Sequence, residues 1–381
     1  MRLSLISSSR FLFSLSSKLA IYTHSGSSIV YFCRQRYTRM HFNTSILPHM
    51  RKLLFPFLTL FLLPAWLWAQ AQVKPLDAEL TNYTYPFPVH FHPLHLQKQQ
   101  LKMAYMDLLP QKPNGHTVLL LHGKNFSGAY WERTAKDLSK NGYRVIMPDQ
   151  IGFGKSSKPE QLQYTFQLLA QNTKSLLDSL GIQKVAVLGH SMGGMLATRF
   201  TLMFPQTVEK FILENPIGLE DWKLWVPYQS VEKWYAGELK QNYESIKKYQ
   251  LDSYFGGQWK PAYDEGVNML AGWTQHPDYP RVAWNSALTY DMIFTQPVVY
   301  EFSQIKAPTL LIIGQRDRTA LGKANASPEA RAKLGNYPAL GKETAKKIPN
   351  AKLVELDNVG HMPHIEAYDR FIQPLLQFLK S

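Results

Sequence analysis

The stretch VAVLGHSMGG occupies residues 185–194. Its first four residues form a short apolar run typical of a buried β strand, and a helical pattern begins at Met192. The Gly-x-Ser-x-Gly pattern between them predicts a sharp strand-to-helix turn that raises the hydroxyl of Ser191 clear of a sheet. The pattern alone can arise by chance as a glycine-rich structural turn, but the strand and helix around it favour a functional interpretation. We therefore predict that Ser191 is a nucleophile.

A serine nucleophile requires a base, because its hydroxyl reacts poorly while it keeps its proton. His361 lies in the segment NVGHMPH, residues 358–364, between the last apolar β-type run and the C-terminal helical pattern. A loop at the carboxyl end of a strand is where ligands bind in open α/β sheets. His361 is therefore the predicted base, and His364, one turn further along, is the alternative.

The histidine in turn needs a carboxylate that orients its ring and stabilises the imidazolium ion. Asp317, in the segment GQRDR at residues 314–318, follows an apolar run and is the predicted acid. Glu214, at the end of the preceding predicted strand, is an alternative acid. The structural alternative for Asp317 is a surface aspartate paired with Arg316 or Arg318.

The segment HGKN, residues 122–125, ends another apolar run. Its glycine turn can direct the backbone N–H of Lys124 toward a developing oxyanion, beside the N–H of Met192 at the start of the predicted helix. Only the backbone of Lys124 is needed there, so its side chain is expected to be a solvated charge.

The segment DQIGFGKS, residues 149–156, lacks the third glycine of a dinucleotide fingerprint and a following helix, and is interpreted as a structural turn.

From about residue 100 onward, short apolar runs alternate with helical patterns, which is typical of a mostly parallel sheet in an α/β protein. Strands are predicted at residues 117–122, 144–148, 185–188, 211–213, 309–314 and 352–356, preceded by an antiparallel strand at 101–109. Helices are predicted at residues 161–180, 192–203 and 366–379. Residues 72–98 are rich in Pro and His and are expected to form an irregular lead-in.

Residues 219–305 interrupt this alternation. They carry no strong strand pattern, but they contain six of the nine tryptophans and helical stretches such as 230–249. We interpret them as a helical cap, or lid, inserted between two core strands, with residues 72–218 and 306–381 forming the core. The aromatic rings of the cap favour an apolar or aromatic substrate, unless they serve only to pack the cap itself.

The net charge of +14 is concentrated near the N-terminus. Nine Lys or Arg residues and no Asp or Glu precede Asp77, so the rest of the chain is only weakly basic and no nucleic-acid binding is predicted. Residues 50–71 combine a basic start, an apolar run and an Ala-Gln-Ala cleavage pattern, as in a signal peptide. We expect residues 1–49 to be an unfolded upstream extension and the protein to be exported, to a periplasm or the exterior. The alternatives are a membrane anchor through residues 53–68 and an organelle transit peptide.

Cys33 is the only cysteine, and it lies ahead of the predicted cleavage site. The mature chain would therefore have no disulfide, no thiolate metal site and no cysteine nucleophile.

Together these motifs resemble the α/β-hydrolase fold family over residues 100–380. The H-G turn, the D-x-x-G-x-G-x-S turn, the G-H-S-M-G-G elbow, the G-x-x-D loop and the final G-H loop follow one another in that family's order. The resemblance implies an eight-stranded, mostly parallel sheet flanked by helices, a cap after the sixth strand, and chemistry without metal or cofactor. A serine at the elbow implies the esterase, C–C hydrolase and aminopeptidase branches. Lys124 and Asn125 depart from the apolar or proline-containing pair of many relatives, which leaves the shape of the oxyanion turn open.

The predicted function is hydrolysis of an ester or similar acyl bond in an apolar or aromatic small molecule, through a Ser-His-Asp triad and an acyl-enzyme. The same residues could cleave a C–C bond next to a carbonyl, hydrolyse an amide or an N-terminal peptide bond, or carry out perhydrolysis. A ligand-binding protein that keeps the fold with little turnover is the alternative of another class.

Overall fold

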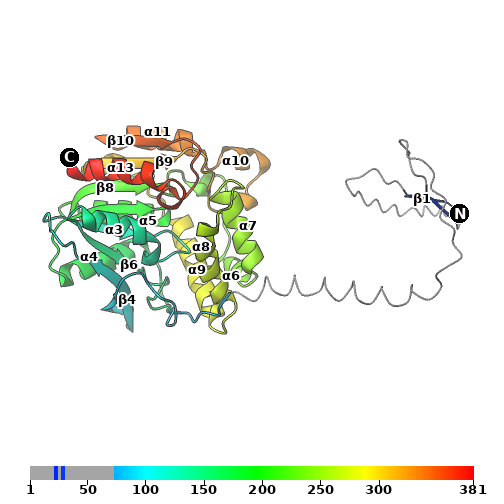
Figure 1. The fold of residues 1–381 in the computed structure, drawn as a ribbon, viewed down its shortest axis with the longest axis horizontal. Helices are drawn as coiled ribbons and strands as arrows, with labels where there is room; N and C mark the ends of the chain where they lie inside the picture. Colours follow the sequence, from blue (N-terminus) through cyan, green and yellow to red (C-terminus); the bar gives the residue numbers. More distant parts are fainter. Residues whose placement is uncertain (1–20, 25–26, 31–72) are drawn as a thin grey trace, which may run out of the picture. The chain divides into compact units, whose positions relative to one another are not determined.

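The computed structural model describes residues 21–24, 27–30 and 73–381 (Figure 1). The first two segments are the strands β1 (Ile21–His24) and β2 (Ser27–Val30), which pair antiparallel with each other. The rest of the predicted upstream extension and the predicted signal peptide, residues 50–71, lie outside the described residues. In the segments that are described, no helix is both long enough and apolar enough to cross a bilayer.

Within residues 73–381, eight strands form one sheet in the order β10-β9-β8-β7-β5-β6-β4-β3. Strands β5 to β10 pair in parallel, whereas β4 pairs antiparallel with β6 and with the edge strand β3. The predicted fold class, a mostly parallel eight-stranded α/β sheet, is thus confirmed. The strands are β3 (Val89–Leu96), β4 (Gln99–Leu108), β5 (Thr117–Leu121), β6 (Arg144–Pro148), β7 (Val185–His190), β8 (Val208–Glu214), β9 (Thr309–Gly314) and β10 (Ala351–Leu356).

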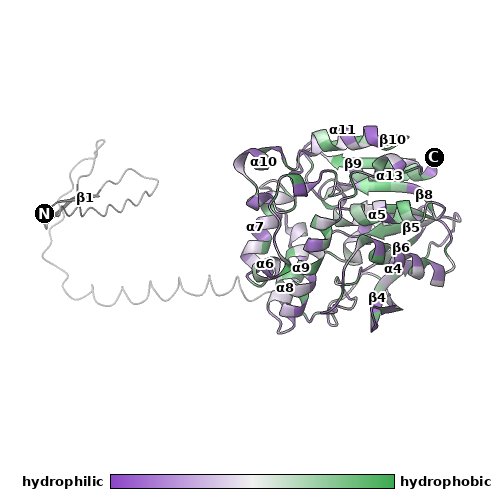
Figure 2. Cartoon of the chain, turned by 180° about the vertical axis from the view of Figure 1, so that it is seen from behind, coloured by the Kyte–Doolittle hydropathy of each residue, from purple (hydrophilic) through white to green (hydrophobic). Residues whose placement is uncertain are grey.

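Helices cover both faces of this sheet (Figure 1). Leu119 and Leu121 of β5 pack toward α4, α5 and α11, while Val118 and Leu120 pack toward α3 and α13. Central strands buried on both faces are mostly apolar, as Figure 2 shows for β9, and this explains why they read as nearly continuous apolar runs. The flanking helices are α3 (Glu132–Lys140), α4 (Phe166–Ser179), α5 (Met192–Met203), α11 (Tyr337–Lys347) and α13 (Tyr368–Lys380).

The segment between β8 and β9, all of it described, forms a helical layer beside the sheet (Figure 1). Its α helices are α6 (Val231–Glu238), α7 (Tyr243–Ser253), α8 (Asp264–Thr274) and α9 (Tyr279–Thr295). The helix predicted over residues 230–249 is therefore two helices. The second begins where Asn242 and Ser245 each bond the other's backbone N–H, a capping box that starts a new helix.

Three other expectations need correction. Residues 72–98 are not wholly irregular, because Val89–Leu96 is the edge strand β3. Its histidines fall on both faces of the strand and Pro93 lies within it, so the sequence lacks the alternation that marks a half-buried strand. The final helix, α13, begins at Tyr368 rather than at residue 366, because residue 366 ends a separate short helix, α12 (Pro363–Glu366). The first long helix starts at Phe166 rather than residue 161, because the side chain of Thr165 caps it.

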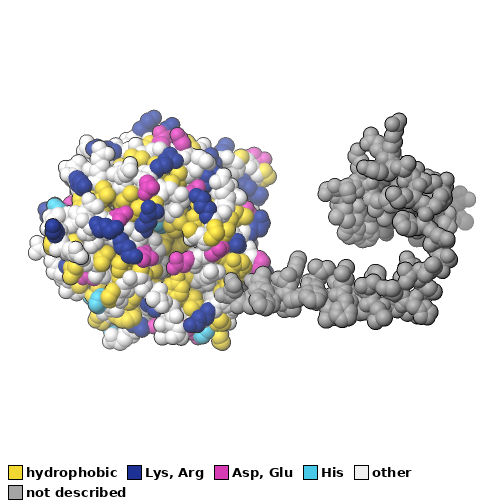
Figure 3. Space-filling model, viewed as in Figure 1, with side chains coloured by type: hydrophobic (Ala, Val, Ile, Leu, Met, Phe, Trp, Pro, Cys, Tyr) yellow, Lys and Arg dark blue, Asp and Glu magenta, His cyan; other side chains and the backbone are white. Residues whose placement is uncertain are grey.

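The remaining short elements are α10 (Pro328–Lys333) and the 3-10 turns η1 (Gly128–Trp131), η2 (Trp222–Leu224), η3 (Pro261–Tyr263), η4 (Phe302–Gln304) and η5 (Lys323–Asn325). On the face of the folded body drawn in Figure 3, Lys and Arg side chains are interspersed with Asp and Glu. That face therefore carries no single extended basic patch.

Candidate active site

Ser191 occupies a sharp turn between β7 and α5, where its backbone has a positive φ of 55°. The turn depends on the glycines around it. A Cβ on Gly189 would lie 2.1 Å from the carbonyl oxygen of Gly193, and one on Gly193 would lie 2.2 Å from that of Leu121. The strained conformation is thus held by backbone packing that only glycine allows.

Ser191, His361 and Asp317 converge in the loops that follow β7, β10 and β9. Nε2 of His361 is 3.0 Å from Oγ of Ser191, and Nδ1 of His361 is 2.6 Å from Oδ2 of Asp317. The three residues are buried, with exposed fractions of 6% for the serine and 0% for the other two. The structure therefore brings together the three residues predicted from the sequence, in contact distances that allow proton transfer from hydroxyl to imidazole.

The carboxylate of Asp317 is surrounded by hydrogen-bond donors. Its Oδ2 also accepts from Nδ2 of Asn215 at 2.8 Å, and its Oδ1 accepts from the backbone N–H of Thr319 at 2.8 Å. Burial by itself would raise the pKa of Asp317, but the charge of His361 and these hydrogen bonds together lower it.

Asn215 is a residue that the sequence prediction missed. It follows β8 directly with a φ of 34°, and its Oδ1 accepts a hydrogen bond of 2.8 Å from the N–H of Gly314. Its side chain therefore connects the end of β8 to the loop that carries Asp317. The available signal was an asparagine directly after a strand, since asparagine tolerates positive φ and bonds nearby backbone.

The alternative base and the alternative acid contact each other instead. Nδ1 of His364 is 2.8 Å from Oε1 of Glu214, which also accepts a 2.8 Å hydrogen bond from the backbone N–H of His364. Burial raises the pKa of Glu214 to about 7, and burial together with the charge of His361 lowers the pKa of His364 to about 3. These two residues form a separate pair behind the elbow.

Gly123 of the predicted oxyanion turn lies directly against Ser191, since a Cβ added to it would be 3.0 Å from that of the serine. Its N–H donates to the hydroxyl of Tyr130 at 2.9 Å, and this hydroxyl is 2.9 Å from Nδ1 of His190. Nε2 of His190 donates to the carbonyl oxygen of His361 at 2.8 Å. Because burial and the charge of His361 lower the pKa of His190 to about 3, its ring is neutral and its Nδ1 accepts from Tyr130. A hydrogen-bonded chain thus joins the oxyanion turn to the loop of the predicted base.

The backbone N–H groups of Lys124 and Met192 are the predicted oxyanion donors. Neither donates a hydrogen bond to any other residue within 73–381. Met192 is the first residue of α5, so its N–H is one of those that a helix leaves without an internal partner. Both N–H groups are therefore available as donors next to the elbow.

Comparison with known proteins shows the family of the chain. The model described as "alpha/beta hydrolase fold" matches residues 116–243. A solved structure of a probable hydrolytic enzyme from Pseudomonas aeruginosa PAO1 is 52% identical, with a TM-score of 0.81, and the match covers 82% of this chain and all of that one. The chain belongs to the α/β-hydrolase fold family.

Curated relatives of this hydrolase are more distant but span most of its length. Lipase 1 of Psychrobacter immobilis is 27% identical over 286 residues, which is 72% of this chain and 81% of the lipase. The 2-hydroxy-6-oxo-6-phenylhexa-2,4-dienoate hydrolase of Burkholderia cepacia is 28% identical over 275 residues, which is 70% of this chain and 88% of that enzyme. These relatives support hydrolytic activity for the chain.

The side chain of Lys124 in this hydrolase is buried, so the expectation of a solvated charge is wrong. Its Nζ is 2.6 Å from Oγ of Ser286, 3.9 Å from the carboxylate of Glu238 and 3.7 Å from the ring centroid of Tyr290. Burial lowers the pKa of Lys124 to about 8, while Glu238 opposes this shift. The prediction failed because all three partners belong to cap helices, which fold over the oxyanion turn.

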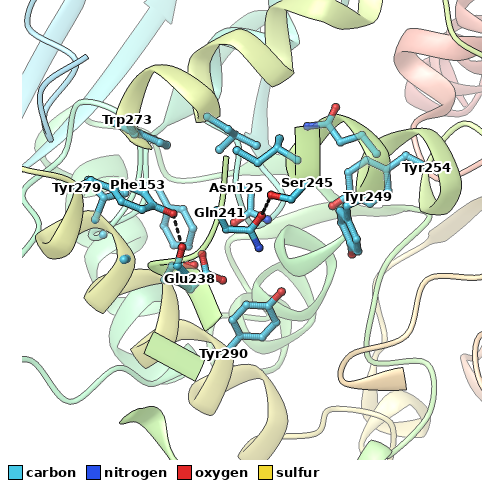
Figure 4. A pocket seen from close by; sticks show the side chains of 17 residues that line it. Asn125, Phe153, Glu238, Gln241, Ser245, Tyr249, Tyr254, Trp273, Tyr279 and Tyr290 are labelled. Atoms are coloured by element: carbon cyan, nitrogen blue, oxygen red, sulfur yellow. Dashed lines mark hydrogen bonds between the residues drawn. The ribbon is translucent and has the colours of Figure 1, made fainter. Parts of the chain in front are cut away.

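A cavity of about 190 Å³ lies between the cap and core of the hydrolase (Figure 4). The ring of Tyr254 in its wall stacks on His361 with centroids 4.8 Å apart, and the carbonyl oxygen of Tyr254 accepts a hydrogen bond from the N–H of His361. The cavity therefore adjoins the predicted base. Of the six cap tryptophans, all in the described part of the chain, Trp273 alone lines it. The other aromatic residues of the wall are Phe153, Tyr249, Tyr254, Tyr279 and Tyr290.

A second cavity of about 410 Å³ is lined by Phe126, Tyr130 and His364 together with cap residues and the chain at residues 83–86. Gln250 of α7 lines both cavities. Among the residues that the structure describes, no cluster of three or more His, Cys, Asp or Glu side chains has the arrangement of a metal site.

Proposed function

We propose that this hydrolase is a serine hydrolase that cleaves an ester or similar acyl bond of a small molecule through an acyl-enzyme. The observation that carries the proposal is the continuous contact from Ser191 Oγ to His361 Nε2, and from His361 Nδ1 to Asp317. A serine hydroxyl becomes a nucleophile when a positioned imidazole accepts its proton.

In the proposed reaction, Oγ of Ser191 attacks the substrate carbonyl while His361 takes the hydroxyl proton. The resulting oxyanion is stabilised by the backbone N–H groups of Lys124 and Met192. His361 then gives its proton to the departing alcohol, and an acyl-enzyme remains. Water repeats the sequence with the same base and releases the acid. Asp317 keeps the imidazole ring oriented and stabilises its charged form throughout.

The proposed substrate is a small molecule with an aromatic or apolar portion. Tyrosine rings and Trp273 supply much of the wall of the cap cavity, and such rings bury large apolar surfaces at small entropic cost. A C–C bond hydrolase is the second candidate, because the relative from Burkholderia cepacia is named as a dienoate hydrolase.

We further propose that the chain is exported. N-terminal sequencing of the mature protein tests this, and a mature chain that began well upstream of Gln72 would contradict it.

The test is turnover of short p-nitrophenyl esters by the wild type and by Ser191→Ala, with fluorophosphonate labelling as a second readout. We expect the variant to lose turnover by about 10⁴-fold or more and to lose labelling. Ser139→Ala, a half-buried serine on α3, is the matched control and should retain both. A folded Ser191→Ala protein that kept its activity would refute the mechanism. A wild type that is neither labelled nor active would favour a ligand-binding role.

A further inference from the structure

Gln250 is a buried residue of the cap whose side-chain Nε2 has no hydrogen-bond partner among the residues that the structure describes. It lies on α7, is 2% exposed, and lines both the cap cavity and the second cavity. Its Nε2 is fully buried and forms no hydrogen bond to any residue within 73–381. A buried amide N–H without a partner is unfavourable, because its hydrogen bonds to water are lost on folding and none replaces them.

The side-chain amide of Gln250 lies beside Gly266 of the neighbouring cap helix α8. A Cβ added to Gly266 of α8 would lie 3.8 Å from Oε1 and 4.0 Å from Nε2 of Gln250, and 3.6 Å from the ring of Phe126. The amide is thus next to the backbone of one cap helix and close to the residue two positions after Lys124. A polar group of this kind in a cavity wall is typical of a ligand-binding site rather than a packed core.

The charges around the cap cavity indicate which ligand group fits. Among the described residues that line this cavity, Glu238 alone carries a formal charge. Its carboxylate lies 3.9 Å from the ammonium group of Lys124. Two of the ammonium donors are directed to Ser286 and Asn125. Because the two formal charges compensate each other, the cavity offers no excess charge to an ion, and a neutral acceptor suits the amide donor of Gln250.

We propose that Gln250 is a specificity-determining residue whose Nε2 donates a hydrogen bond to a neutral acceptor oxygen of the substrate. This oxygen is a carbonyl, ether or hydroxyl oxygen outside the bond that is cleaved. The inference rests on the proposed function and sharpens it: the substrate is an ester that carries a second oxygen-bearing group. A site built to hydrogen-bond such a group discriminates against analogues that lack it, since the buried donor then stays without a partner.

The test compares p-nitrophenyl esters of straight-chain acids with the same esters carrying a ketone at carbon 3, 4, 5 or 6. For the wild type we expect kcat/KM to be about tenfold higher for the oxo ester than for its unsubstituted partner at one of these positions. In Gln250→Met, which has a similar volume but no donor, this ratio should fall to about one. In Gln250→Glu it should fall at least as far. Gln275→Met, at an exposed position after α8, should keep the wild-type ratio.

Thermal unfolding provides the second readout. Removal of an unpartnered buried amide should leave the melting temperature of Gln250→Met equal to or above that of the wild type. A melting temperature several degrees lower, with both ester series slowed equally, would show a structural role and overturn the proposal. So would unsubstituted esters cleaved through Ser191 with no preference for an oxo ester at any position. Failure of the proposed function is distinct, because then no ester would be cleaved and Ser191 would not be labelled.

Discussion

Two buried histidine–carboxylate pairs lie close together in this hydrolase, and among residues 73–381 only one of them has a serine hydroxyl within hydrogen-bond distance. In the first, His361 is 2.6 Å from Asp317; in the second, His364 is 2.8 Å from Glu214. The ring of His190 lies near both histidines, with centroid distances of 4.9 and 5.1 Å. Each pair is therefore a buried contact between a histidine and a carboxylate, but the groups that surround the two pairs differ.

The carboxylates of the two pairs have different hydrogen-bond partners. Asp317 accepts from His361, Asn215 and Thr319, and its pKa is lowered in spite of burial. Oε1 of Glu214 accepts from the backbone of His364, but Oε2 has no partner within residues 73–381, and burial raises its pKa to about 7. A buried carboxylate keeps its charge only where several donors replace water. A buried pair is thus a candidate for catalysis because of its donors and its contact with a nucleophile, and not because of its composition.

The largest expected contrast comes from removing each histidine. His361→Gln should lower kcat for a p-nitrophenyl ester by about 10⁴-fold or more, because Ser191 would lose its base. His364→Gln should change kcat by less than about tenfold, since Nε2 of His364 has no partner within residues 73–381. Steady-state kinetics of the two folded variants measure the contrast. Equal losses would mean that the wrong pair has been assigned to catalysis.

Replacing each carboxylate by its amide should give a somewhat smaller contrast in kcat. Asp317→Asn should lower kcat by about 10³- to 10⁴-fold, because an amide cannot stabilise the imidazolium ion and favours the wrong tautomer. Glu214→Gln should retain most of the activity. The same ester assay checks both, and an inactive but folded Glu214→Gln protein would contradict the comparison.

A smaller effect, on stability, is expected from removing Asn215, whose side-chain amide donates a hydrogen bond to Asp317. Asn215→Ala should reduce the free energy of unfolding by about 1–2 kcal/mol at neutral pH. The part due to the charge of Asp317 should decline as the pH falls below the ordinary aspartate pKa and be lost as it falls through the lowered pKa of the folded carboxyl group, because the folded group is then protonated. Urea unfolding at several pH values measures it. Asn172→Ala, at a buried asparagine of α4, is the control and should lose a constant amount at all pH values.

The smallest expected effect concerns the stability contributed by Glu214. Its raised pKa of about 7 favours folding while the group is protonated in the native state, and that contribution declines as the pH rises from 4.5 through 7. Glu214→Gln cannot ionise, so it should gain about 1 kcal/mol or more relative to the wild type between pH 5 and pH 8. Melting temperatures of both proteins across this range test the prediction. It would be contradicted if the stability advantage of Glu214→Gln over the wild type grew as the pH was lowered.

Several elements could be predicted from the sequence because local patterns encode them. The runs at residues 144–148 and 309–314 coincide with β6 and β9, since strands buried on both faces are mostly apolar. The helix at residues 192–203 coincides with α5. The edge strand β3 was missed because an exposed strand lacks that apolar signal. The helices α10 and α11 were not predicted, because their surface positions are charged or small and leave few periodic apolar residues.

Residues that support the site were less accessible to prediction. Asn215 and Tyr130 act through partners that are 102 and 60 residues distant in the chain. The buried Lys124 contacts Ser286 at a separation of 162 residues, so its environment depends entirely on how the cap folds over the core. No local pattern reports such contacts, since each residue type is equally compatible with an exposed loop.

The sequence by itself determined the turn at Ser191, because glycines on both sides, a strand before it and a helix after it are local requirements of one backbone conformation. It also determined the order of the loops that follow the strands, since parallel strands bring their carboxyl ends to one edge of the sheet. Only the tertiary structure decided that His361 rather than His364 faces Ser191, that three donors surround Asp317, and that the cap buries Lys124 and Gln250. These outcomes depend on how segments far apart in the chain pack together, because a hydrogen bond forms only when that packing brings its donor and acceptor to the right distance and orientation.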